Sequence, residues 1–108
     1  MVGFLFEMYY IYILYSEKHD LYYCGSSEDP WRRLQEHNTS PRNTFTSKYR
    51  PWALKAVFQA GDSRAEAEKY ERFLKKQKSR RLIEKLVDPE FIPQGLLAQL
   101  VRVPHLRD

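Results

Sequence analysis

The sequence predicts an α+β domain in which a small, mainly antiparallel, three-stranded sheet is flanked by helices. Two aromatic, strand-like runs are separated by a short polar turn, a third strand-like run follows a proline, and three segments carry helix starts and helical periodicity. The first two runs lie too close in sequence for a parallel crossover, so they are expected to form a hairpin. A length of 108 residues allows one domain with a modest core.

The first strand is expected to lie at the centre of the sheet. Tyr10, Tyr12 and Leu14 alternate with a second apolar set, so both faces of this strand suit burial. The second strand ends at Gly25, and the third begins after Pro51. The three strands are predicted over residues 8–15, 21–25 and 52–59.

Capping residues mark the helix starts. Asp29 precedes Pro30, so its carboxylate can cap free amides while the proline takes the first helical position. Ser63 and Glu66 form a capping box that opens a longer helix. The helices are predicted over residues 30–38, 63–79 and 80–87, with a break near residue 79, a loop over 39–50 and a last short amphipathic helix over 94–103.

Composition excludes several classes of protein. No stretch is apolar for the length that a transmembrane helix needs, and 43% hydrophobic with 30% charged residues is typical of a soluble domain. The apolar N-terminal stretch has no Lys or Arg before it and is interrupted by Glu7, which favours a strand over an export signal. Cys24 is the only cysteine, which excludes an internal disulfide or a cysteine-based zinc site and fits a reducing cytoplasm.

The charge of the chain favours a polyanionic partner. Its formal net charge is +4 and its pI is about 9.2, and many of the basic residues gather between Lys69 and Lys85. Taken alone, such a run is more often a solvated helix face than a binding surface. The basic excess alone therefore does not establish a binding surface for a polyanion.

Several polar side chains form a set suited to cleaving a phosphodiester. Strand tyrosines accompany Arg33 and His37, which project from one side of a helix because they are four residues apart. A base, a charge clamp and one carboxylate with a divalent cation suffice for this hydrolysis. The carboxylate is either Glu66 or Glu71, which lie at opposite edges of a buried helical stripe, and periodicity does not choose between them. The chain has no nucleophile elbow, Walker-type loop or HExxH motif.

These residues together resemble the GIY-YIG nuclease superfamily, and its small stand-alone bacterial members in particular. The first motif is Tyr10-Ile11-Tyr12 and the second is Tyr23-Cys24-Gly25. The resemblance spans roughly residues 8–86 and continues through Arg33, His37, Asn38, Thr46, the run Arg50-Pro51-Trp52 and Glu71. It implies a nuclease domain over residues 8–87, an N-terminal extension over 1–7 and a C-terminal tail over 88–108 without an assigned role.

The resemblance implies an endonuclease that depends on a divalent metal and hydrolyses nucleic acid, DNA by preference, without a covalent intermediate. Tyr12 would be the general base for an attacking water, Tyr23 would position that water or a phosphate oxygen, and Arg33 would stabilise phosphate charge. His37 would assist proton transfer, and Glu71 would hold one Mg²⁺ or Mn²⁺, with no other cofactor. A phenol has a pKa of about 10, so Tyr12 would need a cation, the metal or Arg33, to lower it.

Contacts with nucleic acid are expected along the backbone and at basic side chains. Gly25 would let a phosphodiester approach the strand closely. The cations expected to hold phosphates, with little sequence selectivity, are Lys48, Lys75, Lys76, Lys78, Arg80 and Arg81. No membrane partner is expected, and the sequence leaves the oligomeric state and the type of substrate structure open.

Two departures from the family pattern keep alternatives open. Tyr10 replaces the glycine that names the first motif, and no asparagine follows Asn43, whereas many members carry one after the glutamate, near the position of Lys85. The main alternative is a nucleic-acid-binding module without hydrolysis, and a third is a protein-interaction domain. Tyr12 and Tyr23 would then be sheet aromatics, and His37 a helix C-terminal partner.

Overall fold

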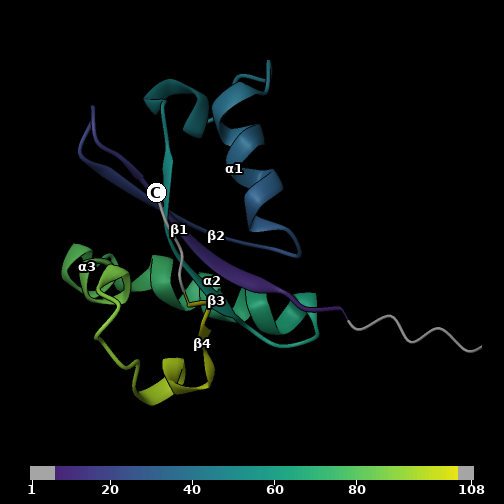
Figure 1. Ribbon diagram of the computed structural model, residues 1–108, viewed down its shortest axis with the longest axis vertical. Helices are drawn as coiled ribbons and strands as arrows, with labels where there is room; N and C mark the ends of the chain where they lie inside the picture. The colour runs from purple at the N-terminus through teal and green to yellow at the C-terminus, as the bar shows by residue number, and fades with distance from the viewer. Residues whose placement is uncertain (1–6, 105–108) are drawn as a thin grey trace, which may run out of the picture.

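The computed structural model describes residues 7–104, which form an antiparallel sheet with helices on both faces (Figure 1). The predicted α+β class is confirmed. The strands are β1 (Tyr10–Ser16), β2 (Leu21–Ser27), β3 (Ala53–Gln59) and β4 (Val101–Arg102), in the order β2-β1-β3-β4. The helices are α1 (Pro30–Thr39), α2 (Arg64–Gln77) and α3 (Arg80–Val87), with the 3₁₀ turns η1 (Thr46–Tyr49) and η2 (Gly95–Gln99).

Strand β1 lies between β2 and β3, as its two apolar faces predicted. It pairs antiparallel with both neighbours, and Tyr12 stands opposite Gly25 on β2 and Val57 on β3. Ile11 and Ile13 are fully buried, as is almost all of Tyr12. The predicted hairpin is confirmed by the β1–β2 pairing, and β2 is left at the edge of the sheet.

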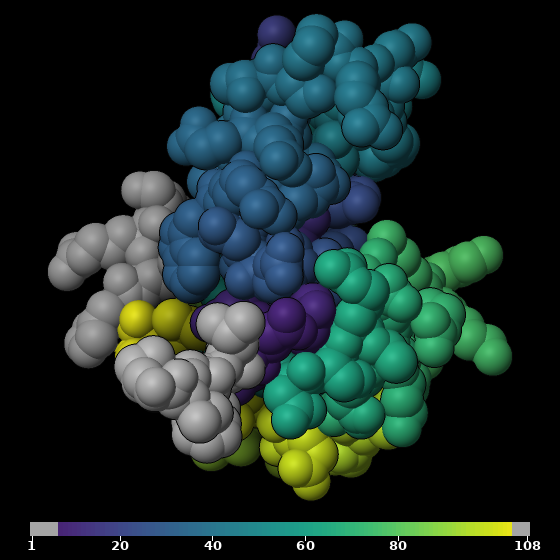
Figure 2. Space-filling model, turned by 90° about the vertical axis from the view of Figure 1, so that its right-hand side faces the viewer, coloured from purple at the N-terminus to yellow at the C-terminus, as the bar shows by residue number. Residues whose placement is uncertain are grey.

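Each face of the sheet carries its own hydrophobic core. The core beside α1 and η1 contains Tyr12, Leu14, Trp52, Leu54 and Val57. The core beside α2 and α3 contains, among others, Ile11, Ile13, Phe58, Ala67 and Leu74. In Figure 2 the blue surface of α1 and the green surface of α2 lie above and below a strip of purple from the start of the described chain. Side chains on alternate positions of one strand therefore serve opposite halves of the molecule.

The predicted helix starts are confirmed by capping hydrogen bonds. Asp29, Ser63 and Ser79 each accept a hydrogen bond from the backbone amide three residues later. Helix α2 ends at Gln77, and the next residue, Lys78, has a left-handed φ of 49° and makes the predicted break before α3. Local sequence chemistry alone thus sets where α1, α2 and α3 begin.

The helix predicted over residues 94–103 is wrong, and the sheet has four strands instead of three. Gly95 has a φ of +63° and begins the 3₁₀ turn η2, and the short β4 pairs with β3. Leu97 and Leu100 both enter the core beside α2. Their spacing of three residues matches one 3₁₀ turn. The predicted apolar side of the segment is therefore buried, but it repeats every 3 residues instead of the 3.6 of an α-helix.

The C-terminal segment belongs to the same folded unit. Arg102 donates hydrogen bonds to the carbonyl oxygens of Leu86, Asp88 and Phe91, and its guanidinium lies 4.7 Å from the Phe58 ring centroid. Residues 88–104, to which the sequence assigned no role, therefore close the core beside α2. Residues 1–6, most of the predicted N-terminal extension, and residues 105–108 lie outside the described residues. No described helix is long and apolar enough to span a membrane.

Gly25 has a packing role that the sequence did not indicate. A Cβ atom at this position would lie 2.4 Å from the Tyr12 hydroxyl oxygen and 2.6 Å from its Cζ. The Tyr12 ring therefore fills the space that any other residue would need. Close approach of a phosphodiester to Gly25 stays a prediction.

We expect Gly25→Ala to lower the free energy of unfolding by about 1–3 kcal/mol, because the new methyl group overlaps the Tyr12 ring. Urea denaturation of the two proteins measures the change. In a Tyr12→Leu background the ring is absent, and the same alanine should cost much less. Equal costs in both backgrounds would show that the ring does not impose the glycine.

Candidate active site

The predicted catalytic side chains meet on the α1 side of the β1–β2 hairpin. Tyr12 extends from β1, Tyr23 and Gly25 from β2, and Arg33 and His37 from α1. The centroid of the His37 ring lies 5.9 Å from that of Tyr12 and 5.1 Å from that of Tyr23. The charge of Arg33 is close enough to shift the pKa of Tyr12. The fold thus gathers four of the predicted residues around the buried phenol of Tyr12.

A line of hydrogen bonds runs from Tyr12 through His37 to η1. The Tyr12 hydroxyl oxygen lies 2.9 Å from His37 Nε2, and His37 Nδ1 lies 2.7 Å from Thr46 Oγ1. Thr46 Oγ1 is in turn 3.3 Å from Thr44 Oγ1. Tyr12 is 1% exposed and His37 is 5% exposed, so their polar atoms depend on one another for hydrogen bonds.

Burial keeps both members of the Tyr12–His37 pair uncharged. Burial, and then the neighbouring Tyr23, raise the pKa of Tyr12 far above its ordinary value although Arg33 opposes the rise. Burial, and then the charge of Arg33, lower the pKa of His37 to about 4. At neutral pH the site therefore holds a phenol and a neutral imidazole, and Arg33 alone does not make Tyr12 a phenolate.

The end of α1 is held by Arg50 and Trp52, which lie between η1 and β3. The Arg50 guanidinium donates hydrogen bonds to the His37 and Ser40 carbonyl oxygens. Asn38 and the Trp52 backbone exchange two hydrogen bonds, of 2.9 and 2.7 Å. Arg50 therefore caps this helix end, and the His37 ring is free for its contacts with Tyr12 and η1.

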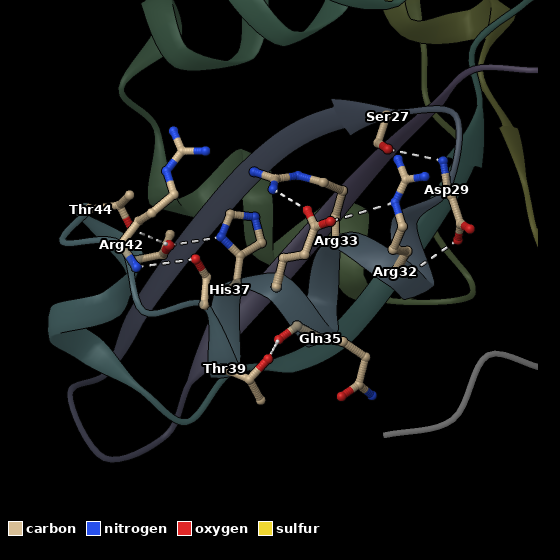
Figure 3. A network of polar contacts seen from close by, with 12 residues as sticks. Ser27, Asp29, Arg32, Arg33, Gln35, His37, Thr39, Arg42 and Thr44 are labelled. Carbon is tan, nitrogen blue, oxygen red and sulfur yellow. Dashed lines mark hydrogen bonds and ion pairs between the residues drawn. The ribbon is translucent and has the colours of Figure 1, made fainter.

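Arg33 presents its guanidinium at the open side of the site. Its Nη1 lies 2.6 Å from Glu36 Oε1, and Glu36 also lies 3.6 Å from Arg32. Figure 3 shows the Arg33 guanidinium and the His37 ring on the same side of α1. The Arg33 side chain is 37% exposed, so its remaining N–H groups are accessible to a phosphate oxygen.

Glu71 approaches from α2, on the other face of the sheet. Ser26 Oγ donates a hydrogen bond of 2.5 Å to Glu71 Oε1, and the Lys75 ammonium lies 2.7 Å from Glu71 Oε2. The same ammonium lies 5.0 Å from the centroid of the Tyr23 ring. Glu71 is thus linked around the edge strand β2 to the side that carries Tyr12. Glu66 is exposed and has no such link among the described residues.

The donor set around Glu71 fits a magnesium-like ion. No group of three or more His, Cys, Asp or Glu side chains that could hold a metal occurs within residues 7–104. Mg²⁺ is commonly bound by one or two carboxylates and keeps several waters or phosphate oxygens as its other ligands. The Glu71 carboxylate, 22% exposed and with the Ser26 hydroxyl beside it, supplies one such ligand if the ion replaces the Lys75 ammonium at Oε2.

The comparison with known proteins agrees with this geometry. The model of the GIY-YIG catalytic domain matches residues 8–85, more than half of the chain. The chain belongs to the GIY-YIG family. The structure-specific endonuclease subunit SLX1 of Meyerozyma guilliermondii is 36% identical to it over 80 residues, which cover 69% of this chain and 27% of that protein. The chain therefore matches about a quarter of this relative's length.

The basic side chains predicted to contact nucleic acid divide into two groups. Arg80 forms ion pairs with Asp20 and Glu84, and Lys75 forms an ion pair with Glu71. The side chains without a hydrogen bond or ion pair inside the described part of the chain are those of Lys48, Lys76, Lys78 and Arg81. The second group is the more accessible to phosphate.

Three residues that bear on the site were missed from the sequence. Ser26 lies one residue beyond the predicted end of the second strand, which in the structure continues to Ser27. Arg42 and Phe45 lie in the predicted loop, yet they line a cavity of about 420 Å³ together with Tyr23. A longer second strand would have revealed Ser26, whereas the loop residues carry no periodic signal.

Lowering the pH from about 6.5 to about 4 should destabilise the protein through His37. Its pKa is lower in the folded state, so the unfolded chain binds the extra proton first and stability falls as pH falls through this window. The decrease in the free energy of unfolding that His37 causes should approach about 2–3 kcal/mol at pH 4.

Urea denaturation between pH 7.5 and pH 4.5 checks this expectation with His37→Gln, whose neutral amide has no such titration. The variant should be less stable at pH 7.5 and should lose less on acidification, while carboxylates contribute about equally to both proteins. Changing the exposed His19 to Gln provides the matched control. Parallel profiles of wild type and His37→Gln would contradict the assignment.

Proposed function

We propose that this chain is a divalent-metal-dependent endonuclease that hydrolyses phosphodiester bonds in DNA. The observation that carries the proposal is the buried line Tyr12–His37–Thr46, which lies beside the accessible guanidinium of Arg33. Glu71, linked around β2 to Tyr23, adds the carboxylate that this chemistry needs. Membership of the GIY-YIG family supports the same activity.

Tyr12 acts as a proton relay. Because its pKa is raised, the phenol keeps its proton until it can pass it to a base. Arg33 has only N–H donors to offer the phenol oxygen, so the phenol proton is directed to His37 Nε2, and His37 Nδ1–H donates to Thr46. We therefore assign the Nδ1–H tautomer to neutral His37.

In the proposed hydrolytic step, a water oxygen replaces the leaving sugar oxygen at phosphorus. The attacking water gives a proton to the Tyr12 oxygen while the Tyr12 proton moves to His37 Nε2, and the water oxygen forms a bond to phosphorus. The bond from phosphorus to the leaving sugar oxygen breaks, and that oxygen takes a proton from solvent. His37 then returns its extra proton to solvent, which restores the neutral pair. Arg33 stabilises the charge that develops on the phosphate oxygens, and Tyr23 orients the water or the phosphate.

Glu71 would hold the Mg²⁺ or Mn²⁺. A bound divalent ion would supply positive charge for the phosphate oxygens and the leaving group. Lys75 neutralises the Glu71 carboxylate, and this contact raises the pKa of Lys75 although burial alone would lower it. Lys48, Lys76, Lys78 and Arg81 add contacts to more distant phosphates.

The substrate is DNA with a particular structure, as in repair or recombination. The relative named above is a structure-specific endonuclease subunit, and residues 8–85, which match the family model, include every catalytic residue proposed here. The single cysteine, buried Cys24, has a pKa raised by burial to about 12, and it suits the reducing cytoplasm where we place this activity.

The main alternative is a module that binds nucleic acid without cutting it. One observation favours it: Lys85, near the position where many family members carry an asparagine, has its ammonium 6.0 Å from the centroid of the Phe91 ring and so packs on the C-terminal segment. Cleavage decides between the two. Binding that survives Glu71→Gln, with no cleavage by either protein, would establish the alternative.

Glu71→Gln should abolish metal-dependent cleavage of labelled single-stranded, duplex and branched DNA, because the amide has lost the charge that holds the ion. Gel analysis with Mg²⁺, Mn²⁺ or EDTA measures it. Glu66→Gln, an exposed change earlier on the same helix, is the matched control and should cut normally. Equal cleavage by both variants would remove Glu71 from the site.

Tyr12→Phe should lower the rate of cleavage by about 10²- to 10⁴-fold, since the ring remains but the relayed proton is lost. Single-turnover rates measure the change, and thermal unfolding shows whether the fold is retained. Tyr10→Phe alters a hydroxyl on the same face of β1, outside the hydrogen-bonded line, and should cut at the wild-type rate. A Tyr12→Phe protein as fast as wild type would exclude the relay.

A further inference from the structure

A cavity of about 420 Å³ opens directly beside the proposed active site. Tyr23, Arg33 and His37 form part of its wall, so it is continuous with the residues proposed to bind the scissile phosphate. The rest of the wall comes mainly from residues 40–46, between α1 and η1. Thr46 takes part in the proposed proton relay, but none of the chemistry proposed above uses Ser40, Arg42 or Phe45.

Phe45 is the principal aromatic side chain of the second wall. It is 55% exposed, an unusual degree for a phenylalanine whose position is fixed on two sides. Its ring is stacked with that of Tyr23, with centroids 6.4 Å apart and planes inclined by 29°, and its centroid is 5.0 Å from that of Tyr49. Phe45 is thus a supported aromatic surface that still has area available for a flat ligand.

The loop that carries Phe45 is held by its own hydrogen bonds. The Thr44 amide donates to Ser47 Oγ at 3.0 Å, and Ser47 Oγ donates to the Thr44 carbonyl oxygen at 2.7 Å. Trp52 Nε1 donates to the Thr46 carbonyl oxygen at 2.8 Å. The cavity wall is therefore preorganised, which lowers the entropic cost of binding a ligand.

Arg42 adds a second guanidinium to the wall of the same cavity. Its guanidinium is exposed and makes no hydrogen bond or ion pair within residues 7–104. Figure 3 shows Arg42 on the far side of His37 from Arg33. Two guanidinium groups thus flank the cavity, one at the proposed scissile phosphate and one beyond it.

We infer that this cavity binds one unpaired nucleobase of the substrate strand, next to the scissile phosphate. The base stacks on Phe45, Arg33 holds the phosphate that is cut, and Arg42 contacts the adjacent phosphate. Aromatic stacking tolerates any base, so the pocket recognises that a nucleotide is unpaired and not its identity. A base inside a duplex cannot reach Phe45 without leaving its stack.

This inference rests on the proposed function and narrows it to a class of substrate. The preferred substrates are strands with an unpaired nucleotide at the cut, such as a bulge, gap, flap or open junction. A fully paired duplex must first expel a base, which costs a few kcal/mol and slows its cleavage.

The test is a coupling measurement between Phe45 and the unpaired base. The full chain carrying Glu71→Gln is titrated in EDTA with labelled duplexes that contain one unpaired adenine or, at the same position, an abasic nucleotide. Removing the base should weaken binding by about 5- to 100-fold, and Phe45→Ala should weaken binding of the adenine duplex by a similar factor. The two changes together should cost little more than either alone.

Two further variants make the result specific. Phe45→Trp keeps a stacking surface and should restore most of the affinity for the adenine duplex. Trp31→Ala removes another exposed aromatic side chain, 45% exposed and packed edge-on to Tyr10 outside the cavity, and should leave the effect of the base unchanged. Thermal unfolding of each variant shows whether it is folded.

The outcomes separate this inference from the proposed function. Cleavage by the wild type without coupling between Phe45 and the base would overturn the base pocket and leave the nuclease intact. Coupling without cleavage would keep the pocket and overturn hydrolysis. If Phe45→Ala weakens the adenine and abasic duplexes equally, Phe45 contributes general affinity and the inference is wrong.

Discussion

The burial of one hydroxyl group, that of Tyr12, is the constraint on which the α1 side of the molecule depends. A phenol that is 1% exposed needs a hydrogen-bond partner inside the protein, and His37 Nε2 provides it. That contact requires α1 to pack against the hairpin and Thr46 to meet the other ring nitrogen. Gly25 is required as well, because its missing side chain leaves room for the Tyr12 ring. One buried oxygen therefore links β1, β2, α1 and η1.

The same burial sets the direction in which a proton can move. Desolvation penalises a phenolate at Tyr12 and an imidazolium at His37, and so it separates their pKa values in the sense that keeps the proton on the phenol. Arg33 favours a negative Tyr12 and disfavours a positive His37. A phosphate that pairs with Arg33 would reduce that second effect and make His37 a better proton acceptor. In the proposed mechanism, binding of the substrate and activation of the relay would thus be coupled through the Arg33 guanidinium.

Much of this organisation was predictable because its signals are local. Asp29, Ser63 and Ser79 mark helix starts by capping, and the two apolar faces of the first strand place it between two others. The C-terminal segment was mispredicted because Leu97 and Leu100 fit a period of 3 as well as 3.6. The role of Phe45 could not be predicted, since an exposed loop aromatic becomes informative only when Tyr23, distant in sequence, supports it.

The choice between two glutamates shows why a site of this kind needs the tertiary structure. Periodicity places Glu66 and Glu71 equally well beside a buried helical stripe, and only the strand packed on α2 distinguishes them. Ser26 contacts Glu71, and Lys75 connects that carboxylate to Tyr23. Both contacts depend on β2 being the edge of the sheet, because a further strand there would separate α2 from the face that carries Tyr12. In the proposed mechanism, the edge of β2 is therefore where the Glu71 carboxylate from one face and the Tyr12–His37 relay from the other would act on the same phosphate.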